Sequence, residues 1–407
     1  MSAGTAVVRG SDSLPDRPPI SAPPRLEPRN LREADQGAVA RQPALGLAGL
    51  LFVVPVAVLL GVGAGSLQAS LRVLGPLSTF ALPVVAMIAF WWEDWPGARL
   101  KAPLSGLLNT VLVIAGGVVL TLIGQLVVGK GTIRGVFDAT PGPHSSPTFP
   151  ATMPLAGAFF VVMLQLTLVN EGWPLRRLGR IASAPVAVLA SWAIALTLYL
   201  LLIRTLPEPG SGLYFRGGGP LSGAAFGAML TAIGLWQVLF YVALRGWPFA
   251  QVASRGVRLS LANLTVIGAG VVTYVVLHSA IGLAPPKASA VAGAALTAAL
   301  LRGMLFEGLR RSGDSHARQR MIMVGTVAVV GAALYAALTA IAHQARWTTA
   351  TPEEWVTYAG LNAIGLGVIL HVGIGRRWPF ARAEDYALRD SSTAGCCECH
   401  APTGGAT

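Results

Sequence analysis

Asn170-Glu171-Gly172-Trp173-Pro174 is the stretch from which the rest of the chain can be ordered. It closes an apolar run of membrane-spanning length and is followed by a basic segment. The same Trp-Pro pair, again after a long apolar run and with Arg beyond it, recurs at 95-96, 247-248 and 378-379. Trp favours headgroup depth, Pro cannot extend the preceding helix, and Arg favours the cytoplasmic side. We interpret each copy as an interfacial stop that ends a span.

A fifth copy has diverged. The segment Phe306-Glu307-Gly308-Leu309-Arg310 keeps the Glu-Gly pair but has Leu-Arg in place of Trp-Pro. A second similarity links the segments 114-119 (IAGGVV) and 267-272 (IGAGVV), whose offset of 153 residues is close to the 152 between Trp95 and Trp247. Each unit would then hold an outward helix, an inward helix and a stop.

The pattern therefore predicts five parallel two-helix repeats, which share one orientation and are related by an axis along the membrane normal. We expect a ring or bundle of hairpins. The alternative is chance likeness, because membrane helices rich in Ala and Gly resemble one another.

The composition predicts an all-α polytopic membrane protein. Of the 407 residues, 53% are hydrophobic and 12% are charged, more apolar surface than a soluble core can bury. About ten segments approach the length of ~20 residues that a hydrocarbon core requires. The expected spans are 45-65, 71-92, 104-128, 152-170, 183-203, 220-243, 260-283, 288-308, 321-343 and 354-375.

The distribution of basic residues predicts the topology. Of the 30 Lys and Arg, 22 lie in the N-terminal segment or after an even-numbered span, seven in the opposite loops, and Arg302 within a span. The positive-inside rule places both termini in the cytoplasm of a plasma (inner) membrane protein. Because the basic residues flank apolar runs, they indicate topology and do not predict nucleic-acid binding.

Three regions are expected. Residues 1-43, rich in Pro and Arg, are predicted to be a disordered cytoplasmic tail without a cleaved secretory signal. Residues 44-380 form the ten-helix transmembrane domain, and residues 381-407 form a cytoplasmic C-terminal tail.

Charges recur two positions before the Trp of each stop. Intramembrane carboxylates usually mark ion pathways, but every carboxylate here falls in a tail, a loop or the last turn of a span. If the hairpins form a ring, the recurrent charges would meet at one depth and pair as a cytoplasmic gate. Solvated interfacial charges are the alternative. The candidates are Glu93, Glu171, Arg245, Glu307 and Arg376. Arg302 either reaches the interface or pairs with one of these Glu residues.

A second set of polar side chains lies within the spans. These groups either line a wet path or join helices through hydrogen bonds. The candidates are Asn109, Gln125, Gln165, Gln237, Asn263, His278, Asn362 and His371. His278 and His343 lie near the outer ends of their spans, where imidazoles could ligate haem or copper, although neither has a second ligand one turn away.

The chain ends in a Cys/His cluster, Cys396, Cys397, Cys399 and His400. Thiolates beside an imidazole can hold Zn(II) or Cu(I), but the spacing lacks the usual Cys-x-x-Cys pairs. A metal at this cluster is possible, and no other cofactor is expected.

Three functions fit these observations. The first is a transporter or channel-like protein for an unknown small solute. The second is a non-catalytic anchor or scaffold for partner subunits in the lipid bilayer. The third is a membrane-embedded haem or copper redox protein. An enzyme is not favoured, because no phosphate-binding loop, nucleophile elbow or His-Glu-x-x-His motif is present.

Overall fold

The computed structural model describes residues 41–128, 133–139, 149–204, 218–307 and 315–381. Within these ranges the chain is helical and forms no named strand; two isolated β-bridges join Ile203 to Leu221 and Arg204 to Gly218. Nine of the described helices are long and apolar enough to cross a membrane. A tenth apolar helix, Met153–Val169, is shorter. It overlaps the expected span 152-170.

The long helices fall into two groups by burial. The inner helices are α4 (Leu67–Ala86), α7 (Met153–Leu164), α9 (Gly223–Val238), α11 (Pro285–Leu300) and the pair α13 (Pro352–Tyr358) and α14 (Leu366–Ile369). The outer helices are α3 (Ala44–Val62), α5 (Ala102–Val128), α8 (Arg180–Leu202), α10 (Arg255–Val275) and α12 (His316–Ala342). The span containing α4 is 78% buried, whereas that of α12 is 17% buried. Outer helices therefore offer most of the surface to lipid.

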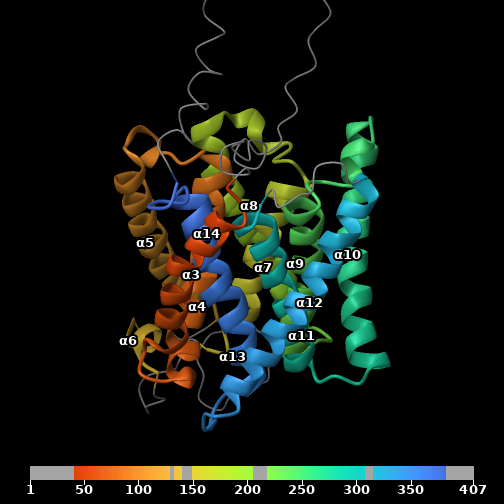
Figure 1. Cartoon of the computed structure of the whole chain (residues 1–407). Coiled ribbons are helices and arrows are strands. Elements are labelled where there is room, and N and C mark those ends of the chain that lie inside the picture. Colours follow the sequence, from red (N-terminus) through yellow and green to blue (C-terminus); the bar gives the residue numbers. More distant parts are fainter. Residues whose placement is uncertain (1–40, 129–132, 140–148, 205–217, 308–314, 382–407) are drawn as a thin grey trace, which may run out of the picture.

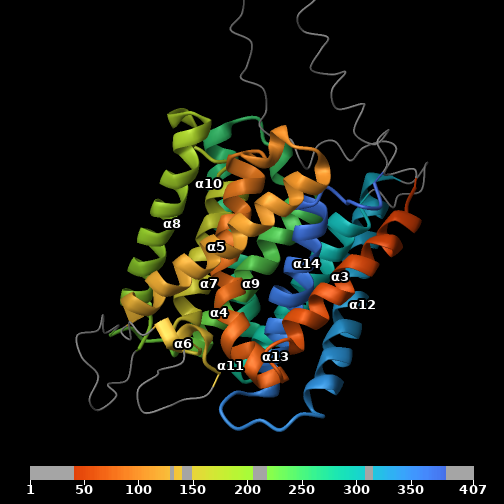
Figure 2. The ribbon, with the colours of Figure 1, turned by 90° about the vertical axis from the view of Figure 1, so that its left-hand side faces the viewer.

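The inner helices close into a ring. Along the ring, α4 contacts α7, α7 contacts α9, α9 contacts α11, α11 contacts α13, and α13 returns to α4. Figures 1 and 2 show these helices at the centre of the bundle, with α5, α8, α10 and α12 at its periphery. The short helix α6 (Ile133–Phe137) lies at the end opposite the stops.

Each outer helix packs on the inner helix that precedes it in the chain. Thus α5 packs on α4, α8 on α7, α10 on α9 and α12 on α11. The first outer helix, α3, packs on the segment Ala359–Gly365 between α13 and α14, so the same relation continues from the end of the chain to its beginning.

Glycine permits the closest of these contacts. A Cβ added to Gly117 on α5 would lie 2.8 Å from the Cβ of Ala81, and one added to Gly270 on α10 would lie 2.6 Å from the Cα of Ile233. Both distances are too short for a side chain, so the two backbones touch. Such contacts stabilise helix pairs in lipid through van der Waals packing.

The inner helices end in a recurrent local geometry. Each continues into a π-helical turn, and these turns are Met87–Trp91, Gln165–Val169, Leu239–Ala243, Leu301–Leu305 and Leu370–Ile374. At the four Trp-Pro stops, two consecutive residues with positive φ follow, such as Glu171 and Gly172, and then a cis Trp-Pro bond. We call the end of the molecule where these turns lie the stop end.

Candidate functional site

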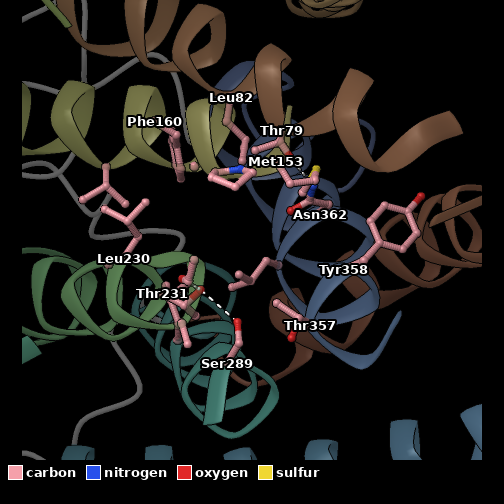
Figure 3. Close-up of a pocket in the computed structure, with 18 of the residues that line it drawn as sticks. Thr79, Leu82, Met153, Phe160, Leu230, Thr231, Ser289, Thr357, Tyr358 and Asn362 are labelled. Atoms are coloured by element: carbon pink, nitrogen blue, oxygen red, sulfur yellow. Dashed lines mark hydrogen bonds between the residues drawn. The ribbon is translucent and has the colours of Figure 1, made fainter. Parts of the chain in front are cut away.

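The ring of inner helices encloses a central cavity of about 750 Å³. Residues from α4, α7, α9, α11 and α13 line it (Figure 3). Residues of α14 and residues near the ends of α5 and α8 complete the wall. Its wall reaches Arg204, which is exposed, so the cavity approaches the surface at the end opposite the stops. The volume lies within the range of roughly 300–1,000 Å³ that is typical of small-molecule sites.

Polar side chains line the cavity from its middle to the end opposite the stops. Five of them, on four helices, are Thr79, Thr231, Ser289, Thr357 and Asn362. Tyr358 lies beside them, and Glu354 lines the wall one turn of α13 nearer the surface. We call this region the polar half of the cavity.

The other half, toward the stop end, has a different character. Its lining residues include Phe90, Leu164, Leu168, Val238, Val242, Leu300, Met304 and Ile369. Among the described residues that line this half, none has a polar side chain. We call it the apolar half. The cavity is therefore divided along its axis into a polar and an apolar region.

Hydrogen bonds fix the side chains of the polar half. The amide nitrogen of Asn362, in the segment Ala359–Gly365 between α13 and α14, donates to Ser78 Oγ at 3.0 Å and to Thr79 Oγ1 on α4. Across the cavity, Thr231 Oγ1 on α9 lies 3.1 Å from Ser289 Oγ on α11 (Figure 3). These bonds join neighbouring inner helices in pairs: the segment Ala359–Gly365 with α4, and α9 with α11.

Two of the predicted polar-path residues, Gln125 and Asn362, line the cavity. Three others form a chain of amides that joins α7, α9 and α10 away from it. Gln237 donates to Gln165 Oε1 at 2.6 Å, Gln165 donates to Asn263 Oδ1 at 2.8 Å, and Asn263 donates to Asn170 Oδ1 at 2.7 Å. For these residues the structure shows helix–helix hydrogen bonds.

The remaining candidates also lie away from the cavity wall. Asn109 is fully buried and donates to the carbonyl of Asp94 at 3.3 Å. His278 is exposed, and its Nδ1 lies 2.9 Å from the carbonyl of Leu283. His371 is buried near the stop end and stacks on Phe52 with a ring-centroid distance of 5.1 Å. The two histidines occupy different ends of the molecule, so they do not share a site.

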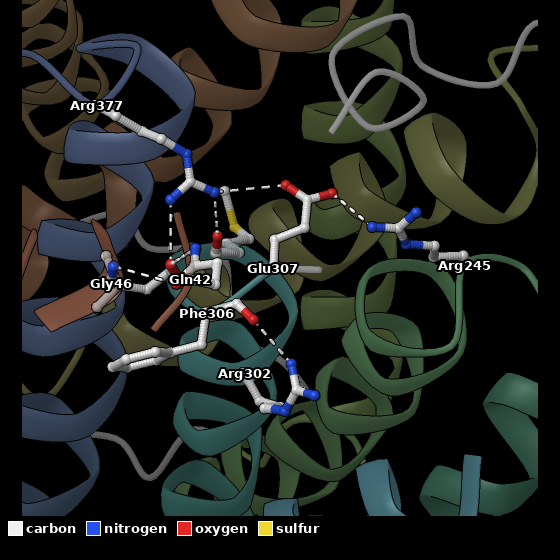
Figure 4. Close-up of polar contacts among 9 residues, drawn as sticks. Gln42, Gly46, Arg245, Arg302, Phe306, Glu307 and Arg377 are labelled. Carbon is white, nitrogen blue, oxygen red and sulfur yellow. Dashed lines mark hydrogen bonds and ion pairs between the residues drawn. The ribbon is translucent and has the colours of Figure 1, made fainter. Parts of the chain in front are cut away.

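The charges at the stop end form ion pairs between different helices (Figure 4). Arg245, beyond α9, lies 2.8 Å from Glu307, beyond α11, and Arg377, beyond α14, approaches the same carboxylate at 3.5 Å. Arg377 also donates to the carbonyls of Met304 and Leu305. Glu307 thus connects the ends of three inner helices.

The predicted set of gate charges pairs in a different pattern from the one expected. Arg245 and Glu307 pair with each other, but the other three members bind partners outside the set. Arg376 pairs with Asp94 at 3.0 Å, and Glu93 approaches Arg180 at 3.9 Å. Glu171 receives two bonds from Arg258 on α10, at 2.8 and 3.0 Å. Apart from Arg245–Glu307, each of these ion pairs therefore joins a predicted charge to a residue outside the set that lies on or just beyond another helix.

Two arginines at the stop end donate hydrogen bonds to backbone carbonyls. Arg302 donates to the carbonyl of Phe306 at 2.8 Å, so it caps the end of its own helix (Figure 4). Arg176 donates to the carbonyl of Phe90 and lies over the Trp91 ring. Burial lowers the pKa of Arg176, and the charge of Glu93 partly opposes this effect. Arg176 thereby ties the end of α7 to that of α4.

Sequence reasoning missed several residues of both regions. Asp94 and Arg377 follow the predicted Glu93 and Arg376 directly, and the sequence alone could not choose between the neighbours. The hydroxyls of Thr231, Ser289 and Thr357 were overlooked because a Ser or Thr in a membrane helix commonly bonds to its own backbone. The signal that could have found them is that all three lie on even-numbered spans.

The predicted metal cluster at Cys396, Cys397, Cys399 and His400 lies outside the described residues. Within the described ranges, no group of three or more His, Cys, Asp or Glu side chains is arranged to hold a metal ion. Comparisons of the chain with protein-family models, curated proteins and solved structures found no match. Any proposal about function must therefore be argued from the geometry of the cavity and of the stop end.

Proposed function

We propose that this protein is a multi-pass plasma-membrane transporter of the carrier type, whose central cavity binds a solute. The observation that carries the proposal is the closed ring of inner helices around a cavity of about 750 Å³. A scaffold subunit has no need of an open axis, because filling the axis with side chains would give more packing energy. A carrier requires such a space.

The proposed architecture is a pseudo-fivefold arrangement of parallel two-helix repeats. Three observations support it: the recurrent backbone geometry at the stops, the packing of each outer helix on the preceding inner helix, and the return of α3 to the last inner helix. Gly117 and Gly270, related by the 153-residue offset seen in the sequence, make equivalent close contacts with α4 and α9. In such a ring the axis is the natural path for a solute.

The stop end is proposed to face the cytoplasm and to be the closed gate. Its orientation follows from the excess of Lys and Arg on that side. The ion pairs Arg245–Glu307, Glu307–Arg377 and Arg376–Asp94 link the ends of α9, α11, α14 and α4 beyond the apolar half of the cavity. Breaking these pairs would let the helix ends separate, while the polar half approaches the opposite surface.

Cysteine labelling in sealed vesicles tests this proposal. In a background with Ser in place of Cys396, Cys397 and Cys399, Met304→Cys places one thiol in the apolar half beside the gate. We expect slow reaction with a membrane-impermeant maleimide added at the stop end, and at least a threefold faster reaction when Glu307→Gln is added. The matched control is Ala299→Cys, a buried position on α11 away from the cavity wall.

The proposal fails if Met304→Cys and Ala299→Cys react at the same rate with and without Glu307→Gln. In that case the ion pairs would not control access to the cavity, and a carrier gate at the stop end would be excluded. A melting curve of each variant checks that the comparison is made on folded protein.

A further inference from the structure

The two halves of the cavity differ in the chemistry that they offer to a bound molecule. The apolar half presents aliphatic and aromatic side chains from α4, α7, α9, α11 and α14, such as Phe90, Leu168 and Leu300. A hydrated ion or a small polar solute would lose its water there without gaining hydrogen bonds, which is costly. An apolar group would be stabilised in the same space.

Donors and acceptors are unequal in the polar half, because the protein already uses the donors. Thr79, Thr231 and Thr357 donate their hydroxyl protons to the carbonyls of Gly75, Gly227 and Glu353, each four residues earlier. Since the proton of Thr231 is used in this way, the bond between Thr231 and Ser289 is donated by Ser289. Each of these oxygens keeps lone pairs that can accept a hydrogen bond.

Two further side chains of the polar half also use their donors within the protein. Asn362 directs its amide nitrogen to Gly75, Ser78 and Thr79, which leaves its carbonyl oxygen as an acceptor. Tyr358 donates its hydroxyl to the carbonyl of Leu60 on α3. Toward the surface, the wall adds the carboxylate of Glu354, the amide of Gln125 and the guanidinium of Arg204, which donates to the carbonyl of Pro220. Deeper in the polar half, the hydroxyls and Asn362 therefore offer mainly oxygen acceptors, which suit a ligand that brings its own donors.

We infer that the cavity binds an amphipathic molecule whose apolar body occupies the apolar half and whose hydrogen-bond-donating head, an amine or a hydroxyl, occupies the polar half. This inference rests on the proposed function, for which it names the class of solute. The head meets the acceptor oxygens of Ser289, Thr357 and Asn362 in the polar half. The body extends toward the stop end.

A series of simple amphiphiles tests the inference. Binding to the full-length protein in nanodiscs is measured calorimetrically, with the heat of empty nanodiscs subtracted. The probes are butylamine, octylamine, octanol and octanoate. We expect octylamine and octanol to bind at least tenfold tighter than octanoate, which cannot donate at neutral pH. From butylamine to octylamine, affinity should rise roughly fourfold for each buried methylene, and less where the chain remains partly exposed.

Two variants and a matched control locate the binding. Thr357→Val removes an acceptor in the polar half at nearly constant shape and should weaken octylamine and octanol at least fivefold, with little effect on octanoate. Leu300→Gln places an amide in the apolar half and should reduce the gain from butylamine to octylamine. Thr297→Val is the control, because Thr297 is a buried hydroxyl on α11 that donates to Gly293 and lies away from the cavity wall.

The inference is overturned if octanoate binds as tightly as octylamine and octanol, or if Thr357→Val and Leu300→Gln bind all probes as Thr297→Val does. Failure of the carrier proposal is seen separately, because the thiol at position 304 reports access from the stop end and needs no ligand. If the protein binds the probes with the predicted preferences but access is not gated, it would be an amphiphile-binding protein and not a carrier. Gated access without these preferences would leave a carrier for a different solute.

Discussion

Arg376 Nη2 lies 3.0 Å from Asp94 Oδ2, so an ion pair joins the end of the last inner helix to the end of the first, 282 residues earlier in the chain. The side chain of Asp94 is 4% exposed and that of Arg376 is 20% exposed. This pair closes the ring between the last inner helix and α4, the first, which are neighbours in space but far apart in the chain. Its position makes it both a structural closure and a component of the proposed gate.

Loss of the Asp94 carboxylate should destabilise the protein strongly. Asp94→Asn removes the carboxylate charge from a largely buried ion pair with Arg376, and breaking a buried pair in this way costs about 3–5 kcal/mol. Glu93→Gln is the matched control, because Glu93 is 35% exposed and its pair with Arg180 is 3.9 Å long, a geometry worth about 0–1 kcal/mol. Thermal unfolding in detergent compares the two. Equal melting temperatures for both variants would contradict the ring closure described above.

The Arg245–Glu307 pair should show energetic coupling. For Arg245→Gln, Glu307→Gln and the double variant, we expect a coupling of about 0.5–3 kcal/mol in the free energy of unfolding, as is usual for groups in contact. Glu93 and Arg376 also belong to the predicted gate set, but the structure places them with other partners. Their cycle should be additive within a few tenths of a kcal/mol. Coupling in the second cycle and additivity in the first would contradict the pairing pattern.

The amide chain should contribute to stability and not to ligand binding. Asn263→Leu removes the partner of both Gln165 and Asn170, which are half-buried, and leaving such polar groups unpaired should cost the lower part of about 1–3 kcal/mol. A lower melting temperature with unchanged octylamine affinity is the expected result. A change in affinity of more than twofold would show that the amides take part in the solute path, the alternative that their positions in the sequence left open.

The close contact between α10 and α9 provides a test of the packing. Gly270→Ala would place a Cβ 2.6 Å from the Cα of Ile233, and such overpacking costs about 1–3 kcal/mol. Gly268 lies two residues earlier on the same helix and has no atom within 4 Å of an added Cβ. Gly268→Ala should therefore leave the melting temperature unchanged or raise it slightly. If both variants melt alike, α10 does not pack on α9 as described.

The positions of the spans could be predicted from the sequence because length and hydropathy are local properties. Leu67–Trp91 and Arg180–Leu202, for example, match the expected spans 71-92 and 183-203 to within a few residues. The division into inner and outer helices could not be predicted with the same ease, because both kinds are apolar. The inner spans tend to be less hydropathic, and this tendency was a usable signal.

The gate charges were predicted by type and depth but not by partner. Arg245 pairs with Glu307, another member of the predicted set, whereas Glu171 pairs with Arg258, which belongs to an outer helix. Partner choice depends on which outer helix covers each stop, and a sequence pattern centred on the inner helices does not contain that information. The cavity could not be predicted from the sequence for a similar reason. Its wall combines single turns from many helices, and their relative placement is not a local property of the sequence.

The central claim, that the cavity on the ring axis is a path between the two membrane faces, is tested most directly by the reactivity of a thiol in its middle. In the background with Ser in place of the three native cysteines, Thr231→Cys is labelled with an impermeant maleimide in sealed right-side-out and inside-out vesicles. A carrier predicts reaction from both faces at different moments, with the stop-end reaction accelerated by Glu307→Gln, while buried Ala290→Cys reacts from neither. Reaction of Thr231→Cys from one face alone, unchanged by Glu307→Gln, would contradict the claim.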